Sequence, residues 1–205
     1  MNRGIHSRGY LPHWDFAKSV QAITFRLADS VPKNIIRKWK EELAPIADDA
    51  LCQKELHHRI AKYEDTGHGE AILADPVCAS IIQNKLIECH GVSCKLIDWV
   101  IMPNHVHVMI RLFEGFSLST IIQGWKGASS SEINRHLCRS CTLWAPDYYD
   151  RYIRDLDHYH DCRAYILNNP VKARLCAKPE DWRFSSAGAD WSADFSPPDA
   201  TQAAD

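Results

Sequence analysis

The sequence predicts an α+β fold: a ferredoxin-like βαββαβ antiparallel sheet with helices on one face, followed by a further C-terminal helix. Three observations lead to this prediction. Residues 19–32 alternate apolar and polar side chains, two later apolar runs are separated by a Pro-Asn pair, and helical patterns stand between the strands. The 205 residues suit one sizeable domain better than two.

The first predicted strand is followed by a charged segment that lies outside the six-element core. Ile23, Phe25 and Leu27 would face the core from the strand. Residues 34–63 have a helical, charge-rich pattern that is interrupted at Pro45. We interpret them as a helical insertion, because their removal leaves the βαββαβ order.

The first core helix is marked by signals at both of its ends. Asp75 stands in the position of an N-cap, Pro76 suits the first helical turn, and Gly91 follows the last turn. Val77, Ile81, Leu86 and Cys89 are expected to supply part of an apolar stripe on this helix.

The second half of the chain supplies the remaining elements. Pro103 and Asn104 separate two apolar runs, which predicts an antiparallel hairpin. Pro170 is expected to end the last helix, whose placement relative to the sheet stays open. The predicted elements are strand 94–102, strand 105–112, helix 117–137, strand 147–155 and helix 156–169.

Composition predicts a cytoplasmic protein that is not embedded in a membrane. No apolar run approaches the roughly 18–20 residues of a membrane span, and the first residues lack the apolar segment of a secretory signal. The folded domain is expected to occupy residues 1–186, and residues 187–205 to form a disordered acidic tail. Four aspartates lie in that tail, so the net charge of −2 becomes +2 without it. This balance permits a local basic surface but does not establish one.

The eight cysteines are expected to be reduced thiols, as is usual in the cytoplasm. Cys138 and Cys141 have the spacing of zinc ligands. The pair that would complete such a site, Cys89 and Cys94, is spaced more loosely. A structural zinc site is therefore the less favoured alternative.

Two histidines lie one residue apart in the apolar run VIMPNHVHVMIRL. A strand sends alternate side chains to one face, so His105 and His107 should project together. On a solvated strand face they would be two ordinary polar residues. Neighbouring imidazoles are also common metal ligands, and they bind Mn²⁺ or Mg²⁺ when oxygen atoms complete the coordination shell.

This run is one of several motifs that follow one another along the chain. They read RGYLPH, MPNHVHVMI, GWKG, LWAPDYYDRYIRD, YILNNPVKA and EDWRFSSA. In these motifs the chain resembles the REP-associated tyrosine transposases, a family within the single-tyrosine HUH transposase superfamily. The resemblance covers most of the chain outside residues 187–205.

The resemblance implies a DNA nuclease and strand transferase. Tyr165, on the C-terminal helix, matches the nucleophile that forms a 5′-phosphotyrosine link. His105, His107 and Asn169 match the ligands of a divalent metal, Mg²⁺ or Mn²⁺. Tyr165 and Asn169 are four residues apart and share one helical face. The implied partner is single-stranded, hairpin-forming repeat DNA, bound by a monomer or a homodimer.

The sequence signals for DNA-contact residues are less specific than those for the catalytic residues. Lys126 in GWKG matches a recurrent basic position of the family, and Arg151 and Arg154 lie on the last predicted strand. Tyr10 and Trp14 are candidates for stacking on unpaired bases. Charged residues on a helix or strand are most often simply solvated.

Other interpretations stay open. Tyr148, Tyr149 and Tyr152 are rivals of Tyr165, and a helical tyrosine is often a core residue. A domesticated protein could bind hairpin DNA without turnover, and a metallo-phosphoesterase could use water as its nucleophile. All four matched site residues are present, which favours the transposase.

Overall fold

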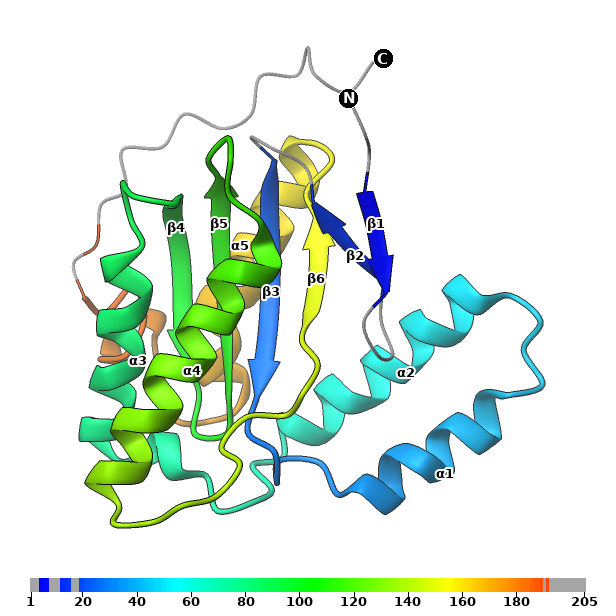
Figure 1. Cartoon of the computed structure of the whole chain (residues 1–205), viewed down its shortest axis with the longest axis horizontal. Helices are drawn as coiled ribbons and strands as arrows, with labels where there is room; N and C mark the ends of the chain where they lie inside the picture. Colours follow the sequence, from blue (N-terminus) through cyan, green and yellow to red (C-terminus); the bar gives the residue numbers. More distant parts are fainter. Residues whose placement is uncertain (1–3, 8–11, 16–18, 190, 192–205) are drawn as a thin grey trace.

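A four-stranded antiparallel sheet forms the centre of the protein (Figure 1). The computed structural model describes residues 4–7, 12–15, 19–189 and 191. The strands, in the spatial order β4-β5-β3-β6, are Cys94–Ile101 (β4), His105–Leu112 (β5), Val20–Arg26 (β3) and Tyr149–Tyr152 (β6). With α3 (Pro76–Glu88) between β3 and β4 and α4 (Leu118–His136) between β5 and β6, they form the predicted ferredoxin-like order.

Helices cover both faces of this sheet. The face formed by alternate residues such as Ile23, Phe25 and Val108 packs against α3 and α4, where Trp125 is buried. The opposite face packs against α5 (Leu156–Lys172), which lies behind the sheet in Figure 1. The C-terminal helix, whose placement the sequence left open, therefore covers the face that carries the even-numbered residues of β3.

The predicted start of α3 is confirmed, but its predicted apolar stripe is partly wrong. The Asp75 side chain accepts a hydrogen bond from the Val77 amide at 2.8 Å and caps the helix. Val77 itself is 47% exposed. The buried residues of the helix are Cys78, Ala79, Ile82 and Leu86, while Ile81 and Cys89 are partly buried against the same core.

The prediction that Pro170 ends the last helix is also wrong. Helix α5 continues through Pro170 to Lys172. Proline lacks the backbone N–H that would donate a helical hydrogen bond. Pro170 lies in the last turn of the helix, where the amides that follow it still have acceptors. The Ala173 amide donates to the Asn169 carbonyl at 3.0 Å, and the Leu175 amide donates to the Pro170 carbonyl at 2.9 Å.

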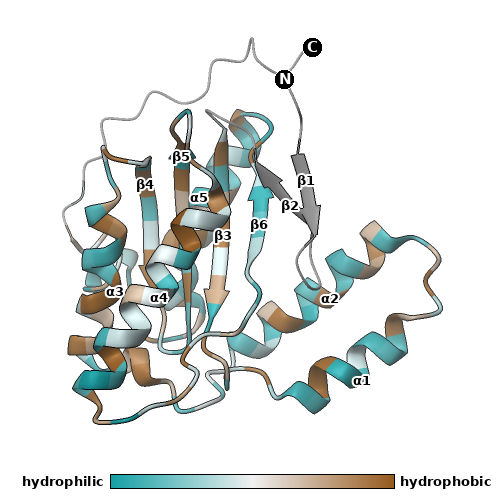
Figure 2. Ribbon diagram, viewed as in Figure 1, coloured by the Kyte–Doolittle hydropathy of each residue, from teal (hydrophilic) through white to brown (hydrophobic). Residues whose placement is uncertain are grey.

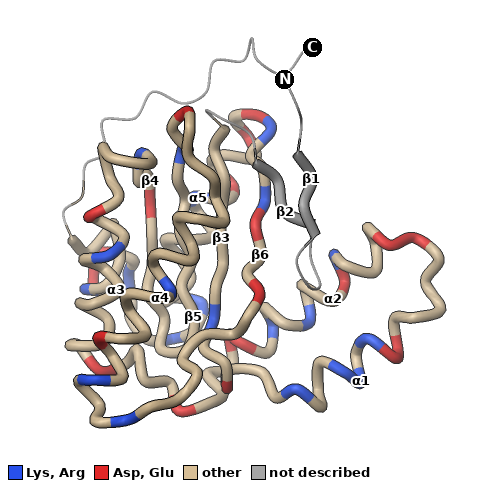
Figure 3. Tube along the Cα trace, in the orientation of Figure 1, with Lys and Arg blue, Asp and Glu red and all other residues tan. Residues whose placement is uncertain are grey.

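The charged insertion forms two helices beside the sheet. They are α1 (Lys33–Leu43) and α2 (Asp49–Glu64), separated by residues 44–48. Figure 2 shows that both are mainly hydrophilic, and Figure 3 shows charges of both signs along them. Asp48 caps α2 by accepting hydrogen bonds from the Ala50 and Leu51 amides.

Two short strands precede the sheet and were not predicted. They are β1 (Gly4–Ser7) and β2 (Pro12–Asp15), which pair with each other in an antiparallel ribbon next to β6. Of the two predicted base-stacking residues, Tyr10 lies outside the described residues, as does the side chain of Trp14.

The segment after α5 covers the outer edge of β4. A 3₁₀ turn, η2 (Pro179–Asp181), leads into it, as η1 (Ile72–Ala74) leads into α3. The Ile101 amide donates to the Phe184 carbonyl at 2.8 Å, and the Ser186 amide donates to the Trp99 carbonyl at 2.9 Å. The edge of β4 is thereby covered by the chain itself at Trp99–Ile101, the last residues of the strand.

Residues 187–189 and 191 are the described part of the predicted tail, and the remainder of 187–205 lies outside the described residues. Trp191 packs edge-to-face against Trp99, with ring centroids 5.0 Å apart. All eight cysteines are free thiols. Among the described helices, none combines the length and apolar character needed to cross a membrane.

Candidate active site

His105 and His107 lie side by side on the sheet face that is covered by α5. Their side chains are 1% and 4% exposed, and their Nε2 atoms are 3.0 Å apart. Burial lowers the pKa of His105 to about 3, and it also lowers the pKa of His107. Both rings are therefore neutral near pH 7, which is the form that binds a metal. The predicted solvated strand face is wrong, because both residues are buried.

A hydrogen-bond chain sets the tautomer of His105. The Asn104 amide nitrogen donates to the carbonyls of Glu64 at 3.1 Å and His68 at 3.0 Å, so its Oδ1 faces the other way. This oxygen lies 2.7 Å from His105 Nδ1 and accepts a hydrogen bond from the Nδ1–H group. Nε2 of His105 consequently carries the lone pair, as in metal sites whose ligating histidines are oriented by a second hydrogen bond.

Thr24 holds the ring of His107 from the neighbouring strand. The register of β3 on β5 pairs Thr24 with His107, and the hydroxyl oxygen lies 2.7 Å from Nδ1. With the hydroxyl as acceptor, Nε2 of His107 has its lone pair directed toward His105. Asn104 and Thr24 were not predicted. Asn104 could have been found from its position in MPNHVH, whereas Thr24 depends on strand register.

Helix α5 brings Asn169 and Tyr165 to the histidine pair. Asp155 caps this helix, and Tyr159, Cys162 and Ile166 are buried on its face toward the sheet. Asn169 is 1% exposed, and its amide nitrogen lies 3.1 Å from His107 Nε2. The ring centroids of Tyr165 and His107 are 5.3 Å apart. One chain thus brings the four predicted site residues together.

The donor set fits a divalent cation. Asn169 Oδ1 is buried and has no hydrogen-bond partner, which is costly for a polar atom unless something else satisfies it. Because the amide oxygen and nitrogen have nearly the same shape, a half-turn of the amide would direct Oδ1 toward the imidazoles. Two neutral imidazoles and one amide oxygen are donors for Mn²⁺, and for Mg²⁺ when further oxygens complete the shell.

Tyr165 lies at the border between the buried site and solvent. It is 37% exposed, so burial in the core does not explain its presence. Burial and the negative charges of Asp65 and Glu64 raise the pKa of its hydroxyl to about 12. Lys172, two turns later in α5, places its Nζ 4.8 Å from the centre of the Tyr165 ring. A cation near the phenol favours the phenolate form.

Glu64 is a buried acid at the end of α2 and was not predicted as part of the site. It is 2% exposed, and its Oε1 lies 3.3 Å from Arg26 Nε. Burial raises the pKa of the Glu64 carboxyl from 4.5 to about 8, although the charge of Arg26 opposes this. The folded protein therefore binds this proton more tightly than the unfolded chain does.

This shift predicts a pH dependence of stability. The Glu64 contribution to the free energy of unfolding is expected to fall as the pH rises from about 4.5 to about 8, because the folded state must then hold a buried charge. Urea denaturation at several pH values should show that the free energy of unfolding falls less with rising pH in Glu64→Gln than in the wild type. The exposed Glu41→Gln is the control. Equal slopes in wild type and Glu64→Gln would contradict the assignment.

The predicted DNA-contact residues lie in different places. Lys126 on α4 donates from Nζ to the carbonyls of Ala145, Pro146 and Asp147, at 2.8, 3.2 and 3.1 Å. Burial lowers the pKa of this ammonium group to about 8.

The two arginines differ from Lys126 and from each other. Arg151 faces the histidine side of the sheet, because it pairs with Ala22 on β3. Arg154 follows the end of β6 and is exposed. DNA binding by these residues stays a prediction.

A second group of potential metal ligands occurs among the described residues. Ligand atoms of Asp75, Cys78 and His136 lie within 4.8 Å of one another, where the start of α3 meets the end of α4. His136 Nε2 is 3.1 Å from Asp75 Oδ2. Its helices cover the opposite side of the sheet from α5, so this group is separate from the histidine pair.

Sequence comparison finds that the segment carrying the candidate site is similar to a known family. Residues 72–169 match the family described as IS200-like transposases. A REP-associated tyrosine transposase from Escherichia coli (strain K12) is 31% identical over 91 residues, which are 43% of this chain and 51% of that protein. The predicted resemblance to the tyrosine transposases is confirmed. The chain spans about half the length of this relative.

We call residues 72–169 the IS200-like segment. Similarity in fold to a solved transposase structure extends beyond this segment. The structure of a REP-associated tyrosine transposase bound to a REP hairpin has a TM-score of 0.55 and 18% sequence identity. The match covers 98% of this chain and 94% of the other. The IS200-like segment contains both histidines, Tyr165 and Asn169. Helices α1 and α2 precede it.

Proposed function

We propose that this protein is a metal-dependent transposase that cleaves and rejoins single-stranded DNA beside hairpin-forming repeats. The observation that supports this most directly is the meeting of Asn169 and Tyr165 on α5 with the histidine pair on β5. The IS200-like segment, and the named relatives that act as REP-associated transposases, support the choice of DNA as substrate. The ability to bind hairpin DNA is part of the proposal.

The proposed reaction is an in-line displacement at phosphorus. The Tyr165 oxygen attacks the phosphorus atom, the bond to the 3′ oxygen breaks, and a 5′-phosphotyrosine link and a free 3′ hydroxyl form. The phenol proton is lost and the departing alkoxide gains a proton. A divalent cation held by His105, His107 and Asn169 would polarise a phosphate oxygen and balance the charge that develops there. The covalent link conserves the energy of the phosphodiester bond for rejoining.

The side chains around Tyr165 support this role. Lys172 lies over its ring, and its positive charge favours the phenolate. Asn104 and Thr24 hold the two imidazoles with the lone pairs on the facing Nε2 atoms. These contacts fix the geometry before substrate binds, which reduces the reorganisation needed for reaction.

The decisive experiment uses the wild-type full chain with end-labelled hairpin DNA that carries single-stranded arms. With Mn²⁺ or Mg²⁺ present, we expect a protein–DNA adduct that survives denaturation, and a chelator should prevent its formation. Cleavage without an adduct would instead identify a phosphoesterase that uses water. Binding without cleavage would identify a protein that retains only DNA recognition. Either of these last two outcomes contradicts the proposal.

A further inference from the structure

A cavity of about 420 Å³ adjoins the candidate active site. Its walls come from the sheet, from α5 and from α2 of the helical insertion. His107 and Tyr165 line it, so it opens onto one of the proposed metal ligands and onto the proposed nucleophile. Its volume is within the range of about 300–1,000 Å³ that is typical of small-molecule sites.

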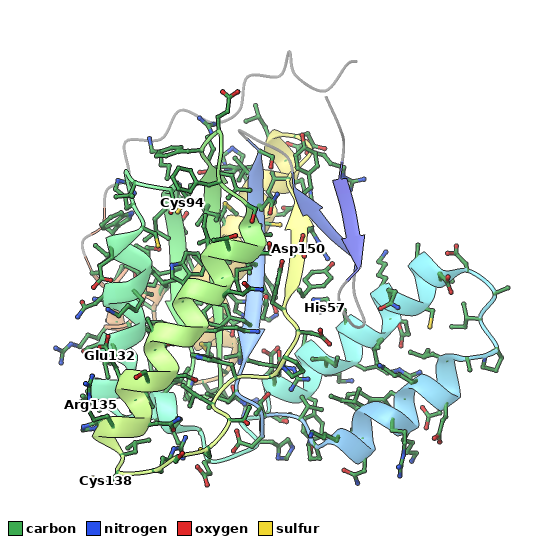
Figure 4. All side chains as sticks on the ribbon, viewed as in Figure 1. His57, Cys94, Glu132, Arg135, Cys138 and Asp150 are labelled. Carbon is green, nitrogen blue, oxygen red and sulfur yellow. The ribbon has the colours of Figure 1, made fainter. Side chains whose placement is uncertain are left out.

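The wall made by α2 and β6 contains a pair of parallel rings. His57 of α2 and Tyr149 of β6 stack with their centroids 3.4 Å apart and their planes 8° apart. Figure 4 labels His57 on α2 and Asp150, the residue next to Tyr149 on β6. Burial and the charges of Arg151 and His58 lower the pKa of His57 to about 4, so the ring is neutral near pH 7. Flat, neutral rings are suited to stacking against a nucleobase.

Positive charge flanks these rings. Lys54 lines the cavity from α2, and Arg151 lines it from β6, where it donates a hydrogen bond to the Tyr149 hydroxyl at 3.3 Å. Asp161 is the one carboxylate among the described lining residues. Basic side chains beside aromatic rings form the combination that binds the backbone and bases of single-stranded nucleic acid.

We propose that this cavity binds the nucleotide joined to the scissile phosphate, with its base against the His57–Tyr149 stack. The inference rests on the proposed function, because only the reaction at Tyr165 defines a scissile phosphate. It assigns a role to the insertion: α2 completes the substrate site that the IS200-like segment begins. Lys54 and Arg151 contact the phosphates next to that nucleotide.

The test measures binding in full-length protein that carries Tyr165→Phe, so that cleavage does not interfere. A fluorescein-labelled DNA hairpin that carries a single-stranded arm is titrated with the protein, and binding is followed by anisotropy. His57→Ala is expected to weaken binding about fivefold or more. An abasic site, moved one nucleotide at a time along the arm, should cause a similar loss at one position. At that position His57→Ala should have no further effect.

A second variant tests the phosphate contact without disturbing the stack. Lys54→Ala is expected to reduce the slope of log Kd against log salt concentration by about 0.7. Lys62→Ala is the matched control, since Lys62 lies on the same helix, is exposed and does not line the cavity. Circular dichroism of each variant checks that α2 remains folded.

The outcomes separate this inference from the proposed function. If His57→Ala has the same effect with every abasic strand and Lys54→Ala matches Lys62→Ala, the cavity does not bind a nucleotide. The wild-type protein could still form its adduct in that case. If no adduct forms but one abasic position cancels the effect of His57→Ala, the cavity binds DNA and the proposed reaction is wrong.

Discussion

Tyr165→Phe is expected to reduce formation of the covalent protein–DNA adduct to background. The substitution removes only the oxygen that would bond to phosphorus, and the Tyr165 ring lies against His107 with the ring centroids 5.3 Å apart. Stability should change little, because Tyr165 is 37% exposed and surface substitutions usually alter the free energy of unfolding by no more than about 0.5 kcal/mol. Denaturing gels of end-labelled DNA, with urea denaturation of both proteins, provide the measurements.

Tyr152→Phe is the control for this prediction. Tyr152 was a rival nucleophile in the sequence, but its pairing with Gln21 places it on the sheet face opposite to Tyr149 and the histidines. It should therefore form the adduct at the wild-type rate. An adduct that persists in Tyr165→Phe and disappears in Tyr152→Phe would refute the assignment of the nucleophile.

Asn169→Ala is expected to weaken Mn²⁺ binding by at least about tenfold, measured by electron paramagnetic resonance in the absence of DNA. The change removes the buried oxygen that lacks a partner and is the one oxygen donor in the proposed ligand set. It leaves His105 and His107 in place, so weak binding to the two imidazoles should remain. Metal affinity is a direct readout, because it does not require turnover.

Asn168→Ala is the matched control for that measurement. Asn168 is the adjacent residue, is exposed, and donates its side-chain hydrogen bond to the Ala164 carbonyl at 2.8 Å within α5. Its loss should leave Mn²⁺ affinity unchanged. If both variants bind Mn²⁺ as the wild type does, Asn169 is not a ligand, and the third position of the site must be filled from elsewhere.

Local sequence patterns were sufficient for the core topology. The alternation of Ile23 and Phe25, the break at Pro103 and the Asp75 cap each depend on near neighbours, and the sheet order follows from them. The errors arose where tertiary packing decides the outcome. Val77 is exposed because the buried face of α3 is centred on Cys78, Ala79 and Ile82. Helix α5 continues through Pro170 because the last turn tolerates a missing hydrogen-bond donor.

The candidate site was predictable only in part, for a related reason. His105, His107, Tyr165 and Asn169 stand in recognisable motifs, and the structure brings them together. The residues around them come from elements whose position depends on register or docking. Thr24 reaches His107 through β3–β5 pairing, while Glu64 and His57 reach the site because α2 folds back beside it. No local pattern in residues 49–64 indicates that placement.

The backbone hydrogen bonds of residues 184 and 186 to β4 have a consequence for solubility. An uncovered edge strand can recruit strands from other molecules and seed aggregation. Strands of other molecules cannot pair with this end of β4 while Phe184 and Ser186 occupy the Ile101 amide and the Trp99 carbonyl. A protein shortened before residue 182 would lose this protection. Preparations nicked by proteases near the C-terminal end should therefore precipitate sooner than intact ones, even though every candidate catalytic residue would still be present.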